Sequence, residues 1–305
     1  MNTRKRQSPA TLQSRKRKNP ETRYVKLRLD KAFVTGFQKR VWEWHQNHAS
    51  LMPWRKTRNP YHIFVSEVML QQTQIPRVLV KYQLFLTEFP TVSALSKAPL
   101  RRVLSVWQGM GYNRRALYLK QAAEIIVKKH AGKVPYNETD LDALPGIGPY
   151  SARAIACFAY GICEPFIETN IRRAVIHEFF PRKTNVTDKK ILQLLQHVQP
   201  SRRQRAWYWA LMDYGREALK GVPNANRNSK HYAKQSKFEG SPRYIRAKII
   251  SYLLENKKAT GKELHTSLKN DKYLSKLSQQ AVKNALVGLT KEKLVGRSGL
   301  FFWIA

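Results

Sequence analysis

Apolar residues recur along most of this chain with the three-to-four-residue spacing of amphipathic helices. In residues 30–48, for example, Phe33, Phe37 and Val41 fall on one face of such a helix. The strict alternation typical of a strand does not occur before residue 290, so the pattern predicts an all-α fold. Further helices are expected over residues 61–74, 76–88, 91–96, 100–108, 114–130, 189–198 and 203–220.

The pattern changes after residue 243, where a separate small unit begins. Three helical segments are followed by two short apolar runs on either side of the sequence GRSG, which indicates a β-hairpin. Three helices and a hairpin predict a winged-helix-like module over residues 244–305. Its third helix could enter the major groove of DNA. Such modules also bind proteins, but the local positive charge favours DNA.

The stretch of residues 144–150 interrupts the helices with the sequence LPGIGPY. Gly146 and Gly148 can both take the positive φ of a tight turn, and Pro149 suits the first turn of the next helix. The backbone N–H groups around Ile147 and the N-terminus of that helix would then point toward the same position. This hairpin is a candidate anion-binding site; the alternative is an ordinary turn between two helices.

Two glutamates stand in unusual surroundings. Glu67 lies among apolar residues, where burial would raise its pKa as a general acid near neutral pH requires. Glu168 precedes Thr169 and Asn170, either of which could cap the next helix, and the positive helix end would keep Glu168 ionised. A neutral acid beside an ionised one is typical of a paired-carboxylate site. The alternative is that Glu67 lies on the exposed stripe of its helix.

Polar residues suited to nucleic acid follow at two places. Gln71 and Gln72 continue the predicted helix of Glu67 and could fill the gap left by a displaced base, or they could be plain surface residues. Tyr112, in the turn after GMG, and Arg114 suit contact with a sugar–phosphate backbone. The alternative for Tyr112 is a core position at a helix cap.

Composition narrows the class of partner. The 305 residues include 56 Lys or Arg and 20 Asp or Glu, a net charge of +36 at pH 7. Double-stranded DNA is therefore the expected partner. A membrane partner is not expected, because no run of about 18 apolar residues occurs. Residues 1–28 are expected to form a disordered basic tail that holds phosphates or serves as a nuclear-type address.

The chain has two cysteines, Cys157 and Cys163. Two cysteines are too few for a structural zinc or iron–sulfur site. We expect them to be small buried thiols in a reduced compartment, and we expect no metal site.

Several sequence blocks resemble the A/G-specific adenine DNA glycosylases, which belong to the helix-hairpin-helix–GPD superfamily of base-excision repair enzymes. The blocks are PWR, NPYHIFVSEVMLQQTQ, FPTVSAL, VLSVWQGMGYNRRA, LPGIGPYSARAI and ETNIRRAV. The resemblance implies a two-lobed helix-hairpin-helix DNA glycosylase fold over residues 29–220. The implied parts are a six-helix lobe at about 53–175, a second lobe from 29–52 plus 176–220, and a basic linker at 221–243.

The resemblance also implies roles for particular residues. Glu67 takes the place of the catalytic glutamate that protonates the adenine leaving group. Glu168 falls where the family has an aspartate that stabilises the cationic sugar, and Asn170 keeps the family's asparagine. Tyr150 stands where lyase-competent relatives place a nucleophilic lysine, so simple hydrolysis is expected. Gln72 matches a residue that inserts into the base stack.

The sequence departs from the family pattern in three ways. Glu168 and Thr169 replace an aspartate and a glycine. The Met-Asp-x-Gly segment is present, but no cysteine occurs in residues 216–240, so we expect no iron–sulfur cluster and a basic loop that grips DNA instead. The C-terminal domain with which the family reads oxidised guanine is not recognisable, because residues 244–305 are too few to form it.

The resemblance implies a monofunctional DNA glycosylase that releases adenine mispaired with guanine or 8-oxoguanine. One alternative is a mismatch thymine or uracil glycosylase on the same scaffold. The other is a non-catalytic DNA-binding homologue in which Glu168 marks lost chemistry. We expect a monomer that acts at the nucleoid in the cytoplasm, or in the nucleus if the source is eukaryotic.

Overall fold

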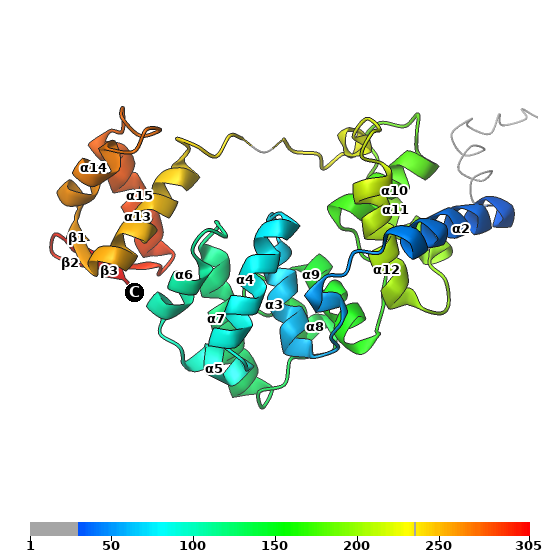
Figure 1. The fold of residues 1–305 in the computed structure, drawn as a ribbon, viewed down its shortest axis with the longest axis horizontal. Coiled ribbons are helices and arrows are strands. Elements are labelled where there is room, and N and C mark those ends of the chain that lie inside the picture. The colour runs from blue at the N-terminus through cyan, green and yellow to red at the C-terminus, as the bar shows by residue number, and fades with distance from the viewer. Residues whose placement is uncertain (1–29, 235) are drawn as a thin grey trace, which may run out of the picture.

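The computed structural model describes residues 30–234 and 236–305, and its body is helical, as predicted (Figure 1). The predicted basic tail over 1–28 lies outside the described residues. The helices before the C-terminal module are α2 (Lys31–His48), α3 (Pro60–Leu70), α4 (Ile75–Glu88), α5 (Val92–Lys97), α6 (Leu100–Trp107), α7 (Arg114–Lys129), α8 (Glu138–Asp142), α9 (Pro149–Ile155), α10 (Thr169–Phe179), α11 (Asp188–Val198) and α12 (Gln204–Asp213). Shorter turns are 3-10 helices at Pro53–Arg55 and Ala225–Asn228 and π-helices at Ala156–Tyr160 and Tyr214–Ala218.

Helix α3 lies between two lobes because it is apolar on nearly every side. Eight of its eleven residues are buried, and a helix that is apolar all round belongs in a protein interior. The carboxamide of Asn59 caps its start by accepting the backbone N–H of Tyr61. Phe64 packs into the core of one lobe, and Ile63 packs into the core of the other.

The two lobes divide near residue 156, earlier than the boundary at 175 that the sequence implied. Helices α3 to α9 bury one apolar cluster, whereas α2, α10, α11 and α12 bury the other. Helix α10 belongs with the second cluster because Ile171 and Val175 are fully buried beside the residues of α12. In Figure 1, α2 and α10–α12 accordingly gather on one side of α3, and α4–α7 on the other.

Cys157 and Cys163 are joined in a disulfide, so the expectation of free thiols is wrong. Cys157 lies in the π-helix, and Gly161 follows in the left-handed conformation (φ 79°). This turn sends the chain back on itself, which brings two residues six positions apart together. The disulfide therefore closes the loop that leads into Glu168.

The predicted linker at 221–243 is partly structured. Residues Ala225–Asn228 form a short 3-10 helix, and Ser229 pairs with Val186 in an isolated parallel β-bridge. The buried side chain of Asn226 donates to the carbonyl of Thr169 at 3.1 Å. The described residues after 230 are exposed as far as residue 240.

The C-terminal module combines three helices with a small antiparallel sheet in the strand order β1-β3-β2. Thr260 and Glu263 form a capping box at the start of α14. The first strand was not predicted, because three residues are too few to show alternation. The elements are α13 (Pro242–Asn256), β1 (Lys258–Thr260), α14 (Gly261–Lys269), α15 (Gln279–Lys291), β2 (Val295–Ser298) and β3 (Phe301–Ile304).

Across the described residues, no helix has both the length and the apolar character needed to cross a bilayer.

Candidate active site

Glu67 is a buried acid on the helix between the lobes. Glu67 is only 5% exposed, so the alternative of an exposed position on its helix is wrong. Burial raises the pKa of Glu67 to about 7, and the charge of Glu168 adds to the rise. A hydrogen bond from Tyr150 and the positive charge of Arg55 act in the opposite direction. Glu67 therefore carries a proton for much of the time near neutral pH.

Tyr150 and Glu168 share the surroundings of Glu67. The hydroxyl of Tyr150 donates to Oε2 of Glu67 at 3.4 Å. Burial, followed by the negative charges of Glu67 and Glu168, raises the pKa of Tyr150 far above its ordinary value. Three residues distant in the sequence are thus electrostatically coupled at one place between the lobes.

Glu168 itself is the N-cap of α10, rather than Thr169 or Asn170 as the sequence predicts. Its carboxylate accepts the backbone N–H of Asn170 at 2.8 Å and the Asn170 side-chain amide at 3.0 Å. Burial raises the pKa of Glu168, although these hydrogen bonds and the charge of Arg172 lower it in part. The expectation that the positive helix end would favour the ionised form of Glu168 is therefore wrong, because desolvation is the larger effect and the pKa is raised.

Gly215 allows α10 to approach closely enough to position Glu168. A Cβ at Gly215 would fall 2.0 Å from the backbone carbonyl oxygen of Asn170. Only a residue without a side chain fits at such a contact. Asn226 holds the neighbouring carbonyl of Thr169 from the other side, so the N-terminus of α10 is fixed by two segments. The Met-Asp-x-Gly segment was the sequence signal for Gly215.

Helix α3 ends earlier than predicted, at Leu70, so Gln71 and Gln72 lie beyond it. The guanidinium of Arg115 donates to the carbonyls of Val68 and Met69, each at 3.0 Å, and to the carbonyl of Gln71. These bonds satisfy the free carbonyls of the last helical turn. Gln72 then takes a positive φ of 53° with its side chain exposed. Gln71 donates its amide to the carbonyl of Gly146 at 3.1 Å and so joins α3 to the hairpin.

The hairpin between α8 and α9 has one left-handed glycine rather than two. Gly146 has φ 76°, and a Cβ there would lie 2.9 Å from the Cβ of Tyr118. Gly148 is extended at φ −112°, so the prediction of a positive φ at this position is wrong. Ile147 is buried, and its N–H donates to the carbonyl of Leu144 at 3.1 Å. That N–H group is used inside the turn rather than offered to an anion.

Tyr112 and Arg114 lie at the surface next to the C-terminal module. Tyr112 is 37% exposed, so a core position is wrong, and it has a positive φ of 46°. Arg243, in the first turn of α13, donates to the hydroxyl of Tyr112. Arg114 forms an ion pair with Glu292 at 3.6 Å. The neighbouring Arg115 has a structural role, because its guanidinium donates to backbone carbonyls. It is mostly buried, and burial lowers its pKa to about 10.

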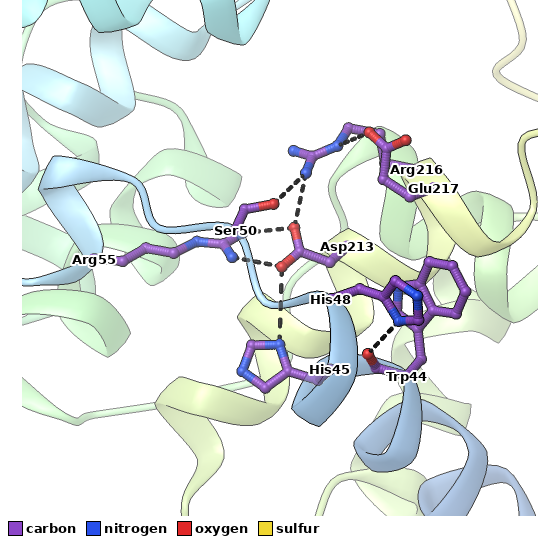
Figure 2. Close-up of polar contacts among 8 residues, drawn as sticks. All are labelled: Trp44, His45, His48, Ser50, Arg55, Asp213, Arg216 and Glu217. Atoms are coloured by element: carbon purple, nitrogen blue, oxygen red, sulfur yellow. Dashed lines mark hydrogen bonds and ion pairs between the residues drawn. The ribbon is translucent and has the colours of Figure 1, made fainter.

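A buried ion network that the sequence did not reveal ties the two lobes together (Figure 2). The carboxylate of Asp213 accepts hydrogen bonds from both Nη atoms of Arg55, at 2.5 and 3.0 Å. It also accepts one from Nη2 of Arg216 at 3.0 Å. His45 from α2 lies 3.8 Å away. Burial would raise the pKa of Asp213, but the nearby His45, the hydrogen bonds from Arg55 and the arginine charges outweigh it and hold the pKa at about 2.

The described residues offer no evident metal site. Among them, no group of three or more His, Cys, Asp or Glu side chains is arranged to hold a metal ion. Two surface hollows, of about 360 and 470 Å³, lie beside His62 and beside Trp42 and are not lined by the coupled acids. The candidate site is therefore described by its side chains.

Comparison with known families assigns the central part of the chain. Residues 65–201 match the family described as HhH-GPD superfamily base excision DNA repair protein. The coupled acids, the hairpin and helix α10 all fall inside this match. This central segment is therefore similar to the HhH-GPD superfamily of base excision DNA repair proteins.

Within that superfamily, the curated proteins that it resembles are adenine DNA glycosylases. That of Buchnera aphidicola subsp. Baizongia pistaciae is 32% identical over 62% of this chain and 55% of its own length. That of Mycobacterium tuberculosis (strain CDC 1551 / Oshkosh) is 43% identical over 43% of this chain and 44% of its own length. The human protein is 35% identical over 48% of this chain and 28% of its own length. The chain thus spans about half the length of the first two relatives.

Solved structures show the same fold. A thermostable thymine-DNA glycosylase aligns with a TM-score of 0.54 and 22% identity, covering 70% of this chain and 95% of that one. A non-covalent endonuclease III–DNA complex aligns with a TM-score of 0.53 and 16% identity, covering 62% of this chain and 89% of that one. At such identities the likeness concerns the fold alone.

Proposed function

We propose that this chain is a monofunctional DNA glycosylase of base excision repair that hydrolyses the N-glycosidic bond of adenine mispaired with guanine or 8-oxoguanine. The observation that carries the proposal is the burial of Glu67, which raises its pKa to about 7, together with its coupling to Glu168 and the hydrogen bond from Tyr150. The likeness to adenine DNA glycosylases over the segment that holds these residues supports adenine as the base released.

The substrate must leave the duplex before it can react. A base inside the stack is inaccessible, so the nucleotide is extruded toward α3 between the lobes. We propose that Gln72, which is exposed just beyond the end of α3, occupies the gap in the stack. The hairpin at Gly146 and the turn at Tyr112 hold the flanking backbone.

The two acids then act at opposite ends of the bond that breaks. Cleavage leaves electron density on the purine and positive charge on the sugar. Glu67 donates its proton to the adenine as the bond lengthens. The ionised carboxylate of Glu168, oriented by Asn170, stabilises the cationic sugar until water attacks it. The positive charge that forms on the sugar itself favours the ionised form of Glu168.

Tyr150 favours hydrolysis over strand cleavage. Its phenol stays protonated because its pKa is raised, and it donates to Glu67. Without an amine at this position, no Schiff base with the sugar forms by that route.

An iron–sulfur cluster does not fit the residues of this chain. Such a cluster needs four thiolates, whereas the two cysteines here are bonded to each other. The loop at Ala225–Asn228 instead packs on α10 through Asn226. We expect the purified protein to contain no stoichiometric iron and to lack the visible absorbance of a cluster; a cluster signal would contradict this part of the proposal.

The partner is duplex DNA that carries a mispair, in keeping with a net charge of +36. We propose that a monomer suffices and that it acts where the chromosome lies, at the nucleoid or in the nucleus. A single band shift of one protein per duplex, with a sedimentation mass of one chain, checks this.

A panel of mispaired duplexes tests the activity. Oligonucleotides that hold A·8-oxoguanine, A·G, T·G or U·G are incubated with protein and then treated with alkali to cut abasic sites. Release of adenine from the first two is the expected result. Cleavage of T·G or U·G alone would instead establish a pyrimidine glycosylase, and binding without base release would indicate a non-catalytic protein.

The variant Glu67→Gln tests the proposed acid. We expect single-turnover base release to fall by about 10²–10⁴-fold, because the amide cannot donate the proton in the same way, while duplex binding is retained. Glu124→Gln makes the same substitution at an exposed position of α7 outside the site and should leave the rate unchanged. Equal rates for wild type and Glu67→Gln would remove Glu67 from the mechanism.

A further inference from the structure

We propose that the C-terminal module is a second DNA-binding site, which grips the duplex beside the mispair through helix α15. The inference rests on the proposed function only in that this duplex is the substrate of the glycosylase domain. Neither the family match nor the relatives assign a role to this module.

The module is docked on the glycosylase domain rather than only tethered to it. The guanidinium of Arg101, on α6, donates to the carbonyls of Leu253 and Leu254 in the last turn of α13. Those carbonyls have no partner within the helix, and a cation at a helix C-terminus is favourable. Figure 1 shows α13 beside α6 while the linker crosses from the opposite lobe. The docking therefore fixes the orientation of α15.

Two further contacts place the module next to the proposed DNA-binding turn. Arg243 donates to the hydroxyl of Tyr112, and its guanidinium lies 5.5 Å from the ring centroid. Arg114 pairs with Glu292, the residue that caps the C-terminus of α15. The C-terminal end of α15 is thus anchored by Arg114, which follows Tyr112 by two residues in the sequence.

Helix α15 presents one polar, basic stripe to solvent. Its buried positions are Val282, Ala285, Leu286 and Leu289, which face the module core. The opposite stripe is exposed and follows the three-to-four-residue helical spacing. It consists of Gln280, Lys283, Asn284, Val287 and Lys291.

The chemistry of this stripe matches the major groove of DNA. The amides of Gln280 and Asn284 can both donate to and accept from base edges, and Val287 can contact a thymine methyl group. Lys283 and Lys291 suit phosphates. The amide of Gln280 already donates to Asn284 at 2.7 Å, so the two side chains lie together.

The charge of the module favours a polyanion over a neutral or basic protein surface. Residues 244–305 hold twelve Lys or Arg and four Asp or Glu. Three of these acids are engaged inside the module: Glu292 pairs with Arg246, Asp271 pairs with Lys248, and Glu263 caps α14 at Thr260. Helix α15 itself contains no acid, so nothing on its exposed stripe repels a phosphate.

Charge reversal on α15 tests the inference with the full chain and undamaged DNA. Lys283→Glu is compared with Lys129→Glu, which makes the same change at the exposed far end of α7. Each is titrated against a duplex of about 30 base pairs and against one of about 10, too short to span both sites. We expect Lys283→Glu to weaken binding of the long duplex by about tenfold and to reduce its salt dependence. Binding of the short duplex should not change.

The two proposals fail separately in these experiments. Equal affinity of wild type and Lys283→Glu for the long duplex would overturn the inference, as would equal weakening on both lengths or the same loss in Lys129→Glu. Adenine release at saturating protein should match wild type in Lys129→Glu, because that exposed residue is part of neither proposed site. If wild type releases no base, the glycosylase proposal fails while the binding comparison stands.

Discussion

Burial of a single carboxyl group gives the candidate site its chemistry. Glu67 lies on a helix with almost no exposed surface, and desolvation raises its pKa to about 7. The hydrogen bond from Tyr150 moderates this rise without cancelling it. Burial raises the pKa of Glu168 as well, but hydrogen bonds from Asn170 and Ile171 and the charge of Arg172 lower it in part. Glu168 therefore has more groups that support its charged form than Glu67 has, which suits an electrostatic stabiliser beside a proton donor.

We expect base release to depend on pH on both sides of neutrality. The pKa of Glu67 is about 7, so its acid form is lost above that pH and the single-turnover rate should fall about tenfold per pH unit. The pKa of Glu168 is raised above its ordinary value, so acid protonates it and the rate falls there too. Rates at saturating protein across the pH range check this. A flat profile above pH 8 would contradict a proton donor at Glu67.

The same carboxyl should cost stability at alkaline pH. Its folded pKa is about 7 against an ordinary value of 4.5, so the folded state resists ionisation and stability falls as pH rises between these values. A tenfold difference in the acid constant between the folded and unfolded chain corresponds to about 1.4 kcal/mol. Glu67→Gln should therefore raise the free energy of unfolding by up to about 3 kcal/mol at pH 8 and change it little near pH 4. Denaturant titrations at both pH values, with Glu124→Gln as the control, measure the difference.

At the scale of elements, close backbone contacts decide where helices sit. Periodicity located the helices, but it placed the end of α3 four residues late, because it carries no information on Arg115. That side chain comes from α7 and satisfies the carbonyls that end α3. The division of the lobes was likewise misplaced, since the burial of Ile171 depends on the packing of α10 against α12.

Gly215→Ala should disturb catalysis through α10. Its added Cβ would meet the carbonyl oxygen of Asn170 at 2.0 Å, and backbone cannot yield as a side chain does. We expect the helix N-terminus to shift and to move Glu168, with base release reduced by at least about 10²-fold, as a displacement near 1 Å can cause. Gly221→Ala, where nothing lies within 4 Å of the added Cβ, is the matched control. Full activity in both variants would show that α10 tolerates the shift.

At the scale of the molecule, the Asp213 network joins the lobes that hold the two acids. Arg55 precedes α3 in one lobe, whereas Asp213 and His45 belong to the other (Figure 2). The side chains of Arg55 and Asp213 are only 9% and 1% exposed. Removal of one partner leaves a buried charge without compensation, which is more costly than loss of a surface pair.

Asp213→Asn should lower the free energy of unfolding by about 3 kcal/mol or more at neutral pH. Asp188→Asn removes the half-exposed partner of Arg172 and should cost less than about 1 kcal/mol. The pKa of Asp213 is about 2, below its ordinary value, so its contribution is present near neutrality and is lost as pH falls toward 2. The difference between the variants should therefore shrink in acid. Equal costs at pH 7, measured by denaturant unfolding, would show that the network does not hold the lobes together.

The sequence by itself determined what local pattern and composition encode. Helical periodicity predicted the all-α body, and the residues around Gly146 and Glu67 carried the family resemblance. The net charge of +36 pointed to DNA before any fold was known. These properties depend on residues near one another in the chain, so they survive without coordinates.

Only the tertiary structure decided which distant residues act together. Asp213 meets Arg55 across 158 positions, and Tyr150 meets Glu67 across 83. The disulfide, the cap at Glu168 and the docking of α13 on Arg101 were decided in the same way. Each depends on how helices pack, and packing sets the desolvation and the charges that a side chain experiences. Periodicity along the chain cannot supply that information, because it records which face of a helix is buried but not what lies against it.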